Sequence, residues 1–264
     1  MPFIHNMDPV LFHIGSTEIR YYGLVYVLGF IVAFIYFIYL IKKGKLNLKT
    51  EEAFELIVYT MVGLIIGSKL FEAFIWYPGY YFQSTENLMT LLKGGNSFHG
   101  GLLGLVAATW LFCRKKDIRG KVRFARMIDH ISIPAIFMVG LAKIANFING
   151  ELPGRLTDVS WCFHFPGKGG CRHPQQIYAA LRSFAVFGWL VFLNRKHHKD
   201  GFIFWNLVTF YGITRAVLDF FREDPSWLGL TMGQYLSLAM FIVGVVVLVR
   251  YYKKDMKRAF SSVR

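Results

Sequence analysis

Acidic residues are scarce in this sequence, and charged residues of both signs are few. Asp and Glu number 16 among 264 residues, and all charged residues together make up 17%, compared with about 25% in typical soluble domains. Hydrophobic residues make up 55% of the chain, and 26 of them are Phe. This composition excludes an ordinary water-soluble domain and indicates a membrane protein.

The shortage of acidic residues leaves a formal net charge of +14, which raises the question of a nucleic-acid partner. Nucleic-acid binding needs a basic face or a recognised binding fold on a soluble scaffold. Here the basic residues lie in short clusters between apolar runs, which is the pattern of membrane topology. We therefore expect a membrane environment and no nucleic acid.

Cysteine is also scarce, and its spacing excludes the common metal sites. Cys113, Cys162 and Cys171 form none of the pair spacings of metal ligands, so we expect no metal. Cys162 and Cys171 share one polar loop that we place outside the cytoplasm, where a disulfide is permitted. From the sequence alone, a disulfide bond and two free thiols are equally good interpretations. It also lacks the pattern of a removable signal peptide, so the first apolar run is expected to remain as a span.

Seven apolar runs are long enough to cross a bilayer, which takes about 17–25 residues. They lie at roughly 22–41, 53–75, 98–113, 127–147, 174–193, 201–221 and 231–250. We therefore predict an all-α integral membrane protein with about seven transmembrane helices. Residues 1–264 are expected to form a single polytopic domain, because neither an internal repeat nor a soluble segment interrupts the runs.

The connecting segments predict the orientation of the chain. Twenty of the 30 Lys and Arg residues fall in one alternate set of connectors and six in the other. Because Lys and Arg accumulate on the cytoplasmic side, the first set is expected there, with the N-terminus outside and the C-terminus inside. Connector 148–173 is rich in Pro and Gly, which predicts a small extracytoplasmic loop or cap.

Four basic residues lie inside the apolar runs, namely Lys69, Lys143, Arg182 and Arg215. Intramembrane charges are costly and by default mark a functional site. The alternative is that a long side chain extends to the membrane surface. That alternative is the better interpretation for Arg182, near the outer end of its run, and it also suits Lys69. It suits Lys143 and Arg215 less well, because each has polar neighbours at helical spacing.

Two polar groups accompany these cations near the outer boundary. Lys143 and Asn146 are three residues apart and share a helix face, and Glu151 follows where the helix ends. A single Asn in a membrane helix usually joins helices, but the whole group predicts a polar cavity. Arg215 and Asp219 are four apart, which predicts either a structural ion pair or an Arg that faces an anionic group and is oriented by Asp219.

A third candidate group begins the run at 98–113. His99 precedes Gly100 and Gly101, and glycine lets a backbone or a ligand approach closely. A neutral imidazole at this position is able to accept a proton. From these residues alone, helix packing by the glycines and a hydrogen-bonded His at a helix end are equally good interpretations.

Six segments in fixed order carry a resemblance to a known family. They are "DPVLFHIG" with "IRYYGLVYVLGF", "NSFHGGLLG", "NFINGELPGR", "RHPQQIYAALR", "YGITRAVLDFFRE" and "TMGQYLSLAMFIVG". In these segments the chain resembles bacterial prolipoprotein diacylglyceryl transferases. The resemblance implies a multi-pass, seven-helix enzyme of the bacterial inner membrane with its active site towards the outer leaflet. Such an enzyme moves diacylglyceryl from phosphatidylglycerol to the lipobox cysteine of a prolipoprotein signal peptide, forms a thioether and releases glycerol phosphate.

The resemblance also implies roles for particular residues. His99 and Tyr22 are candidates for thiol activation and proton transfer. Arg215 and Lys143 would hold the phosphate. The remaining residues expected at the phosphatidylglycerol site are Asn146, Glu151, Gly154, Asp219, Gly100 and Gly101. No cofactor and no metal are implied.

The chain departs from the family pattern at several of these positions. The family usually has Arg where Lys143 and Lys69 stand, Gly at Ala145, and Glu at Ala179 and Asp219. Lys143 keeps the charge but loses the planar two-pronged contact that Arg makes with phosphate. These departures motivate an alternative, a diverged paralogue that binds or translocates lipid, or uses another lipid or acceptor. A generic transporter is disfavoured, because the polar residues cluster near the outer side and no repeat is present.

Overall fold

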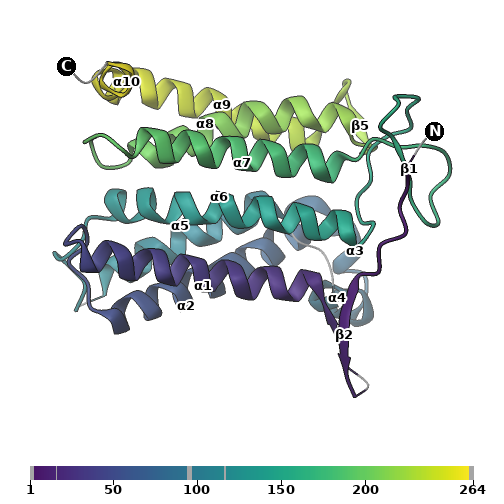
Figure 1. Ribbon diagram of the computed structural model, residues 1–264, viewed down its shortest axis with the longest axis horizontal. Helices are drawn as coiled ribbons and strands as arrows, with labels where there is room; N and C mark the ends of the chain where they lie inside the picture. Colours follow the sequence, from purple (N-terminus) through teal and green to yellow (C-terminus); the bar gives the residue numbers. More distant parts are fainter. Residues whose placement is uncertain (1–2, 16, 94–96, 116, 262–264) are drawn as a thin grey trace. The chain divides into compact units, whose positions relative to one another are not determined.

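A computed structural model of the chain describes residues 3–15, 17–93, 97–115 and 117–261, apart from the side chains of 17, 22, 26, 92 and 93. The chain divides into two compact units. The first unit comprises Met1–Val32 and Asp129–Arg264, and the second comprises Ala33–Ile128. Both are mostly helical, as predicted (Figure 1). That the whole chain acts as one domain stays a prediction.

The second unit consists of helices joined by short connections. Helix α1 begins in the first unit and continues into this one, and the π-helix η1 extends α2 without a break. The elements are α1 (Tyr21–Lys42), α2 (Thr50–Phe71), η1 (Glu72–Trp76), α3 (Pro78–Tyr81), α4 (Thr85–Lys93) and α5 (Phe98–Arg114).

The first unit combines long helices with short strands near their ends. Its helices are α6 (Phe124–Ile148, which begins in the second unit), α7 (Gln175–Leu193), α8 (Phe202–Leu218), the 3-10 turn η2 (Asp219–Phe221), α9 (Met232–Tyr251) and α10 (Lys253–Phe260). Its strands are β1 (Phe3–Ile4), β2 (Val10–Ile14), β3 (Thr17–Arg20), β4 (Phe163–His164), β5 (Ser226–Trp227) and β6 (Leu230–Thr231). Helices α7, α8 and α9 lie side by side (Figure 1).

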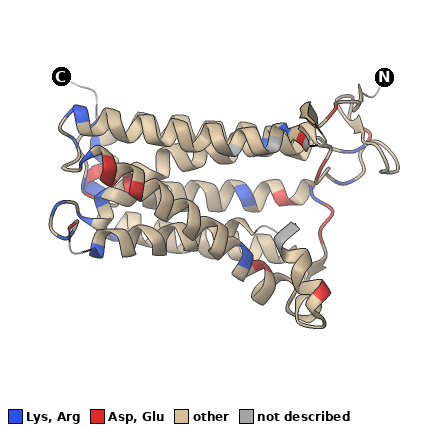
Figure 2. Cartoon of the chain, turned by 90° about the horizontal axis from the view of Figure 1, so that it is seen from below, with Lys and Arg blue, Asp and Glu red and all other residues tan. Residues whose placement is uncertain are grey.

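Five helical segments of the described chain are long and apolar enough to cross a membrane. They are α1, α2 together with η1, α6, α7 and α9. Charged residues lie mostly towards the ends of the long helices (Figure 2). The other two expected spans are also helical, but α5 and α8 have 17 residues each. A helix of that length is about 25 Å long, whereas the hydrocarbon core of a bilayer is about 30 Å thick. The membrane-protein class is confirmed, and the count of seven spans stays a prediction.

Glycines bring the backbones of α2 and α5 into contact. A Cβ atom built on Gly104 would lie 2.0 Å from the carbonyl oxygen of Gly63, and one on Gly67 would lie 2.4 Å from that of Gly100. Such distances are far below van der Waals contact, so no larger residue fits. Small residues at a membrane helix crossing allow this close approach, and the crossing places the start of α5 against the end of α2.

We expect Gly67→Ala to destabilise the second unit, whereas Gly101→Ala is the matched control. A methyl group on Gly67 must separate two backbones, but one on Gly101 meets its nearest neighbour, Leu64 Cγ, at 3.6 Å. Overpacking costs about 1–3 kcal/mol, so the Tm of the purified protein should fall by about 2–10 °C. An equal fall in Tm for Gly101→Ala would contradict this explanation.

A buried carboxylate on α6 fixes the start of α8. Asp129 accepts hydrogen bonds from the backbone N–H of Gly201 at 2.7 Å and of Phe204 at 2.8 Å. A carboxylate is favourable there, because the first N–H groups of a helix lack partners within the helix and carry partial positive charge. Helices α6 and α8 are thereby tied together at the end far from Asn146 and Arg215.

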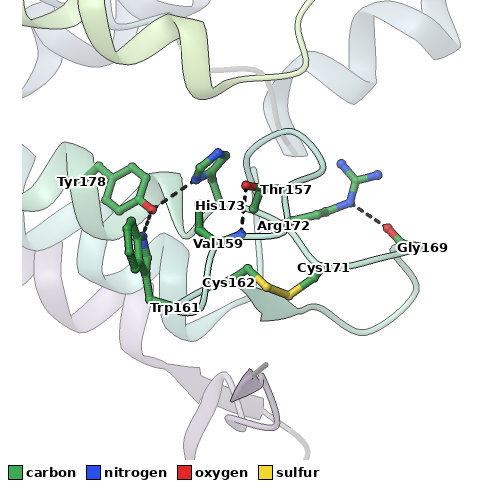
Figure 3. Close-up of a disulfide and its surroundings, with 9 residues drawn as sticks. All are labelled: Thr157, Val159, Trp161, Cys162, Gly169, Cys171, Arg172, His173 and Tyr178. Carbon is green, nitrogen blue, oxygen red and sulfur yellow. Dashed lines mark hydrogen bonds between the residues drawn. A yellow bond between two sulfur atoms is a disulfide. The ribbon is translucent and has the colours of Figure 1, made fainter. Parts of the chain in front are cut away.

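The connector between α6 and α7 is a folded loop, which we call the cap, and its place outside the cytoplasm stays a prediction. Strand β1 pairs in parallel with β4, and the N–H of His5 donates to the carbonyl oxygen of His164, so the N-terminal segment lies along this connector. Cys162 and Cys171 are joined by a disulfide with their Cα atoms 5.6 Å apart (Figure 3). The choice that the sequence left open is therefore settled in favour of the bridge.

Candidate active site

The end of α6 places Glu151 beside Asn146. Gly150 has a φ of +66°, and the N–H groups of Gly150 and Glu151 donate to the carbonyl oxygens of Phe147 and Asn146. This pattern closes a helix with a left-handed glycine and turns the chain back on itself. The side chain of Asn146 then donates to Glu151 Oε2 at 2.9 Å, and that of Asn149 to Oε1 at 3.1 Å. The structure thus brings Glu151 together with Asn146, whereas the polar cavity that Lys143 was expected to share with them stays a prediction.

Helix α7 holds this turn in place. The side-chain amide of Gln176 donates to the backbone carbonyl of Glu151. Gln176 is fully buried and Asn146 is nearly so, which makes the hydrogen bonds between these groups costly to break. Glu151 and Asn146 therefore occupy fixed positions in the first unit.

The end of α8 carries a buried ion pair. Arg215 Nε lies 3.1 Å from Asp219 Oδ1, and the side chain of Asp219 is 0% exposed. Arg222 Nε lies 4.0 Å from the same oxygen and 2.6 Å from Asp224 Oδ2. On α9, a Cβ on Gly233 would lie 2.5 Å from Asp219 Oδ2, so the helix closely approaches the carboxylate. The ion pair predicted from the four-residue spacing is confirmed.

Four cations gather near this ion pair. Lys143 on α6 lies within electrostatic range of Arg182, Arg215 and Arg222, and we call these four residues the cation cluster. Among the described residues, the buried carboxylate close to them is Asp219, whereas the side chain of Asp224 is 36% exposed. Positive charge thus exceeds negative charge in a desolvated region, and an anion would relieve that imbalance.

Arg182 was misread from the sequence. We expected its side chain to extend to the membrane surface, but the residue is only 7% exposed. Its guanidinium carbon lies 4.1 Å from the ring centroid of Tyr211, which is itself buried. Sequence reasoning also missed Tyr211, although it precedes Arg215 by four residues and hence shares its helix face.

Gly154 joins two parts of the cap to the turn η2. Its N–H donates to the carbonyl oxygen of His173, and the next N–H, of Arg155, donates to that of Phe221. A Cβ on Gly154 would lie 2.6 Å from the Phe221 oxygen and 2.8 Å from both the oxygen and the Cβ of His173. Glycine is therefore required for the cap to lie directly against the turn that follows Asp219.

We expect Gly154→Ala to impair activity strongly, because the added methyl group must push the cap away from Phe221 and displace the neighbouring Asp219. Displacements of about 1 Å near reacting groups can cost about 10²-fold in rate. Gly169→Ala is the matched control in the same cap, since a Cβ there meets nothing within 4 Å. Steady-state rates of the two purified variants check this, and equal rates would contradict it.

His173, Tyr178 and Trp161 form a hydrogen-bonded group beside the disulfide loop (Figure 3). The indole N–H of Trp161 donates to the Tyr178 hydroxyl at 2.6 Å, and that hydroxyl lies 3.2 Å from His173 Nδ1. Burial, together with the positive charge of Arg155, lowers the pKa of His173 below its ordinary value. The imidazole is therefore neutral at pH 7, and it connects the cap to the first turn of α7.

In the second unit, His99 lies buried in the first turn of α5. Ser97 caps this helix by accepting from the N–H of Gly100 at 3.3 Å, and it also accepts from Trp76 Nε1 at 2.8 Å. The imidazole packs against the rings of Phe71 and Trp76, both with centroids 6.3 Å away. The aromatic surroundings fix the orientation of His99.

The other expected residues of this unit have structural contacts. Gly100 packs against the backbone of α2, which supports the helix-packing interpretation for that glycine, while Gly101 has room for a methyl group. Lys69 donates to the backbone carbonyl of Leu91 at 2.7 Å, so its charge is held by α4. Participation of Gly100 and Gly101 in substrate binding stays a prediction.

The structure divides the predicted site residues between the units. The first unit holds Lys143, Asn146, Glu151, Gly154, Arg215 and Asp219, and the second holds His99, Gly100 and Gly101. Tyr22 belongs to the first turn of α1, and its side chain lies outside the described part of the chain.

Known proteins match this chain over most of its length. A family model described as prolipoprotein diacylglyceryl transferase matches residues 9–250. A phosphatidylglycerol–prolipoprotein diacylglyceryl transferase of Geobacter sulfurreducens is 40% identical over 258 residues, covering 94% of this chain and 96% of that protein. Proteins of the same name from Idiomarina loihiensis (36% identical, 94% of each chain) and Bartonella bacilliformis (33%, 96% of this chain and 95% of that protein) also match.

Proposed function

This chain belongs to the prolipoprotein diacylglyceryl transferase family, and from that premise we propose how its residues carry out the reaction. It is an enzyme that transfers diacylglyceryl from phosphatidylglycerol to prolipoproteins, the first step of lipoprotein maturation. The alternative of a paralogue that only binds or translocates lipid receives no support from these matches, which carry the transferase name.

The acceptor is the thiol of a lipobox cysteine in the prolipoprotein signal peptide. Its sulfur attacks the glycerol carbon that bears the phosphate, so that a C–S bond forms while the C–O bond to the phosphate breaks. The phosphodiester carries one negative charge, and the departing glycerol phosphate carries two until it gains a proton. Charge therefore grows on the phosphate in the transition state, where preorganised cations are most effective.

The observation that carries the proposal is the excess of buried positive charge in the cation cluster. Lys143 and Arg215 hold the phosphate, and their attraction strengthens as the second charge develops. Asp219 keeps Arg215 in position through the 3.1 Å ion pair. The Asn146–Glu151 turn and Gly154 give the first unit the shape of the headgroup site.

Proton transfer from the thiol is assigned to His99, with Tyr22 as the second candidate. A cysteine thiol has a pKa near 8.5 and is mostly protonated at neutral pH, so a base is needed to form the thiolate. A neutral imidazole is suited to this task, since its unperturbed pKa lies near the operating pH. His99 later returns the proton towards the departing glycerol phosphate.

The membrane arrangement is proposed from the distribution of charge along the chain. All seven predicted spans cross the bacterial inner membrane, with the N-terminus outside and the C-terminus inside. The connectors rich in Lys and Arg then lie in the cytoplasm. The cap and the cation cluster lie towards the outer leaflet, on the side where exported prolipoproteins arrive.

A mass-spectrometric transfer assay tests the proposal. Purified enzyme is incubated with phosphatidylglycerol vesicles and a lipobox peptide, and the peptide mass and released glycerol phosphate are followed. We expect the peptide to gain one diacylglyceryl group for each glycerol phosphate released, and a peptide with Ser in place of Cys to stay unmodified. Glycerol phosphate without modified peptide, or no product at all, would overturn it.

A further inference from the structure

A groove between α7 and α8 has a buried arginine in its wall. Its volume is about 500 Å³, and its lining is apolar except near Arg182 and two hydroxyl groups. It extends from Tyr178 and Leu218, at the cap end of the helices, to Trp189 and Phe210. Ala185, in the middle of the groove, is exposed, and because α7 is apolar enough to span a membrane, we place the open side of the groove towards acyl chains.

Arg182 is a buried cation that forms no ion pair with any described carboxylate. The ion pairs of Asp219 are with Arg215 and Arg222, and no carboxylate in the described ranges lies within ion-pair distance of Arg182. Its Nη2 donates to Ser183 Oγ at 3.3 Å, and its guanidinium lies over the ring of Tyr211, with Asp219 within electrostatic range. Its buried Nε and Nη1 have no hydrogen bond of good geometry to any described residue. A buried charge left in this state is costly, so an anionic ligand is expected.

We propose that this groove binds the phosphatidylglycerol substrate, with the phosphate against Arg182 and one acyl chain lying along the groove towards Trp189. The guanidinium offers planar paired donors suited to phosphate, which Lys143 lacks. Helix geometry places Trp189 about 10 Å further along α7 than Arg182, so the apolar walls begin where the headgroup ends. The identity of the lipid rests on the proposed function, but the binding site does not.

Charge complementarity and the shape of the groove favour this ligand over a protein partner. The groove is apolar along most of α7, and its one charged group lies near the cap end. An anionic amphiphile matches both features at once. Arg182 also lies within electrostatic range of Arg215. A phosphate bound at Arg182 is therefore also attracted by the other members of the cation cluster.

Trp189 provides a direct test of binding that does not require turnover. The enzyme in maltoside micelles is titrated with phosphatidylglycerol or diacylglycerol, both brominated on the acyl chains, and the Trp189 signal is taken as the difference from Trp189→Phe. We expect phosphatidylglycerol to reach half-maximal quenching at a concentration about tenfold lower than diacylglycerol needs, or lower still. Hydrogen bonds between the phosphate and a charged group account for a difference in affinity of this size. Arg182→Leu should remove this preference, and Arg182→Lys should keep part of it.

Activity gives a second readout. Because Arg182 binds the lipid before and during reaction, Arg182→Leu should raise the KM for phosphatidylglycerol about tenfold or more with little change in kcat. Ala185→Trp, which fills the groove from an exposed position, should also raise KM. Leu181→Trp is the matched control, since Leu181 is exposed on α7 and does not line the groove.

The outcomes separate this inference from the proposed function. Equal quenching by the two lipids in the wild type, or a preference that survives in Arg182→Leu, would overturn the inference. An enzyme that shows the preference but transfers nothing to the peptide would retain the binding site and refute the transferase assignment.

Discussion

Replacing Arg215 by Met is expected to slow transfer strongly, and replacing Asp219 by Leu at the same time is expected to restore stability without restoring activity. The single change leaves the fully buried Asp219 carboxylate without its partner 3.1 Å away, which destabilises a protein by about 3–5 kcal/mol. Replacing both members by apolar residues removes this penalty. The phosphate still loses a cation, so transfer should fall about 10²–10³-fold in both variants.

Thermal unfolding and the transfer assay, applied to the same preparations, separate these effects. Arg215→Lys is the control, because it keeps the charge near Asp219 but loses the paired donors of the guanidinium. We expect it to be more stable than Arg215→Met and to retain part of the activity. A double variant that transfers at the wild-type rate would show that the pair serves only the fold.

His99→Ala is expected to slow transfer about 10²–10⁴-fold, the usual contribution of a positioned base. The ring of His99 is buried among Phe71 and Trp76, so its removal leaves a space of imidazole size. Added imidazole should therefore restore part of the activity, which a purely structural defect would not permit. The transfer assay with and without imidazole measures both effects.

The matched control for His99 is His197→Ala, since His197 is exposed in the connector between α7 and α8. That variant should transfer at the wild-type rate with or without imidazole. If His99→Ala kept more than a tenth of the wild-type activity, His99 would not be the base, and Tyr22 would become the leading candidate.

The sequence predicted those parts of the site that depend on local chain geometry. The pairing of Arg215 with Asp219 follows from helical spacing, and the grouping of Glu151 with Asn146 follows from their positions at a helix end. Both are governed by residues within five positions of each other. The helices themselves follow from long apolar runs, although α8 (Phe202–Leu218) is shorter than the run expected at 201–221.

Contacts between segments that are distant in the sequence could not be predicted from it. Arg182 lies in the N-terminal half of its run, and only the packing of Tyr211 from α8 shows that it is buried. The spacing of Cys162 and Cys171 permits a bridge but does not require one. Gly100 packs against α2. This contact depends on how two helices cross, and the crossing cannot be predicted from the residues around Gly100.

Single-turnover kinetics of Lys143→Ala, with enzyme in excess and saturated with phosphatidylglycerol, test most directly whether the cation cluster stabilises the departing phosphate. We expect the rate constant for glycerol phosphate release to fall about 10²-fold or more, because the lost interaction strengthens in the transition state. Lys143→Arg should stay within about tenfold of the wild type, because it keeps the charge. An unchanged rate constant, with only more lipid needed for saturation, would contradict a role of Lys143 in the chemical step.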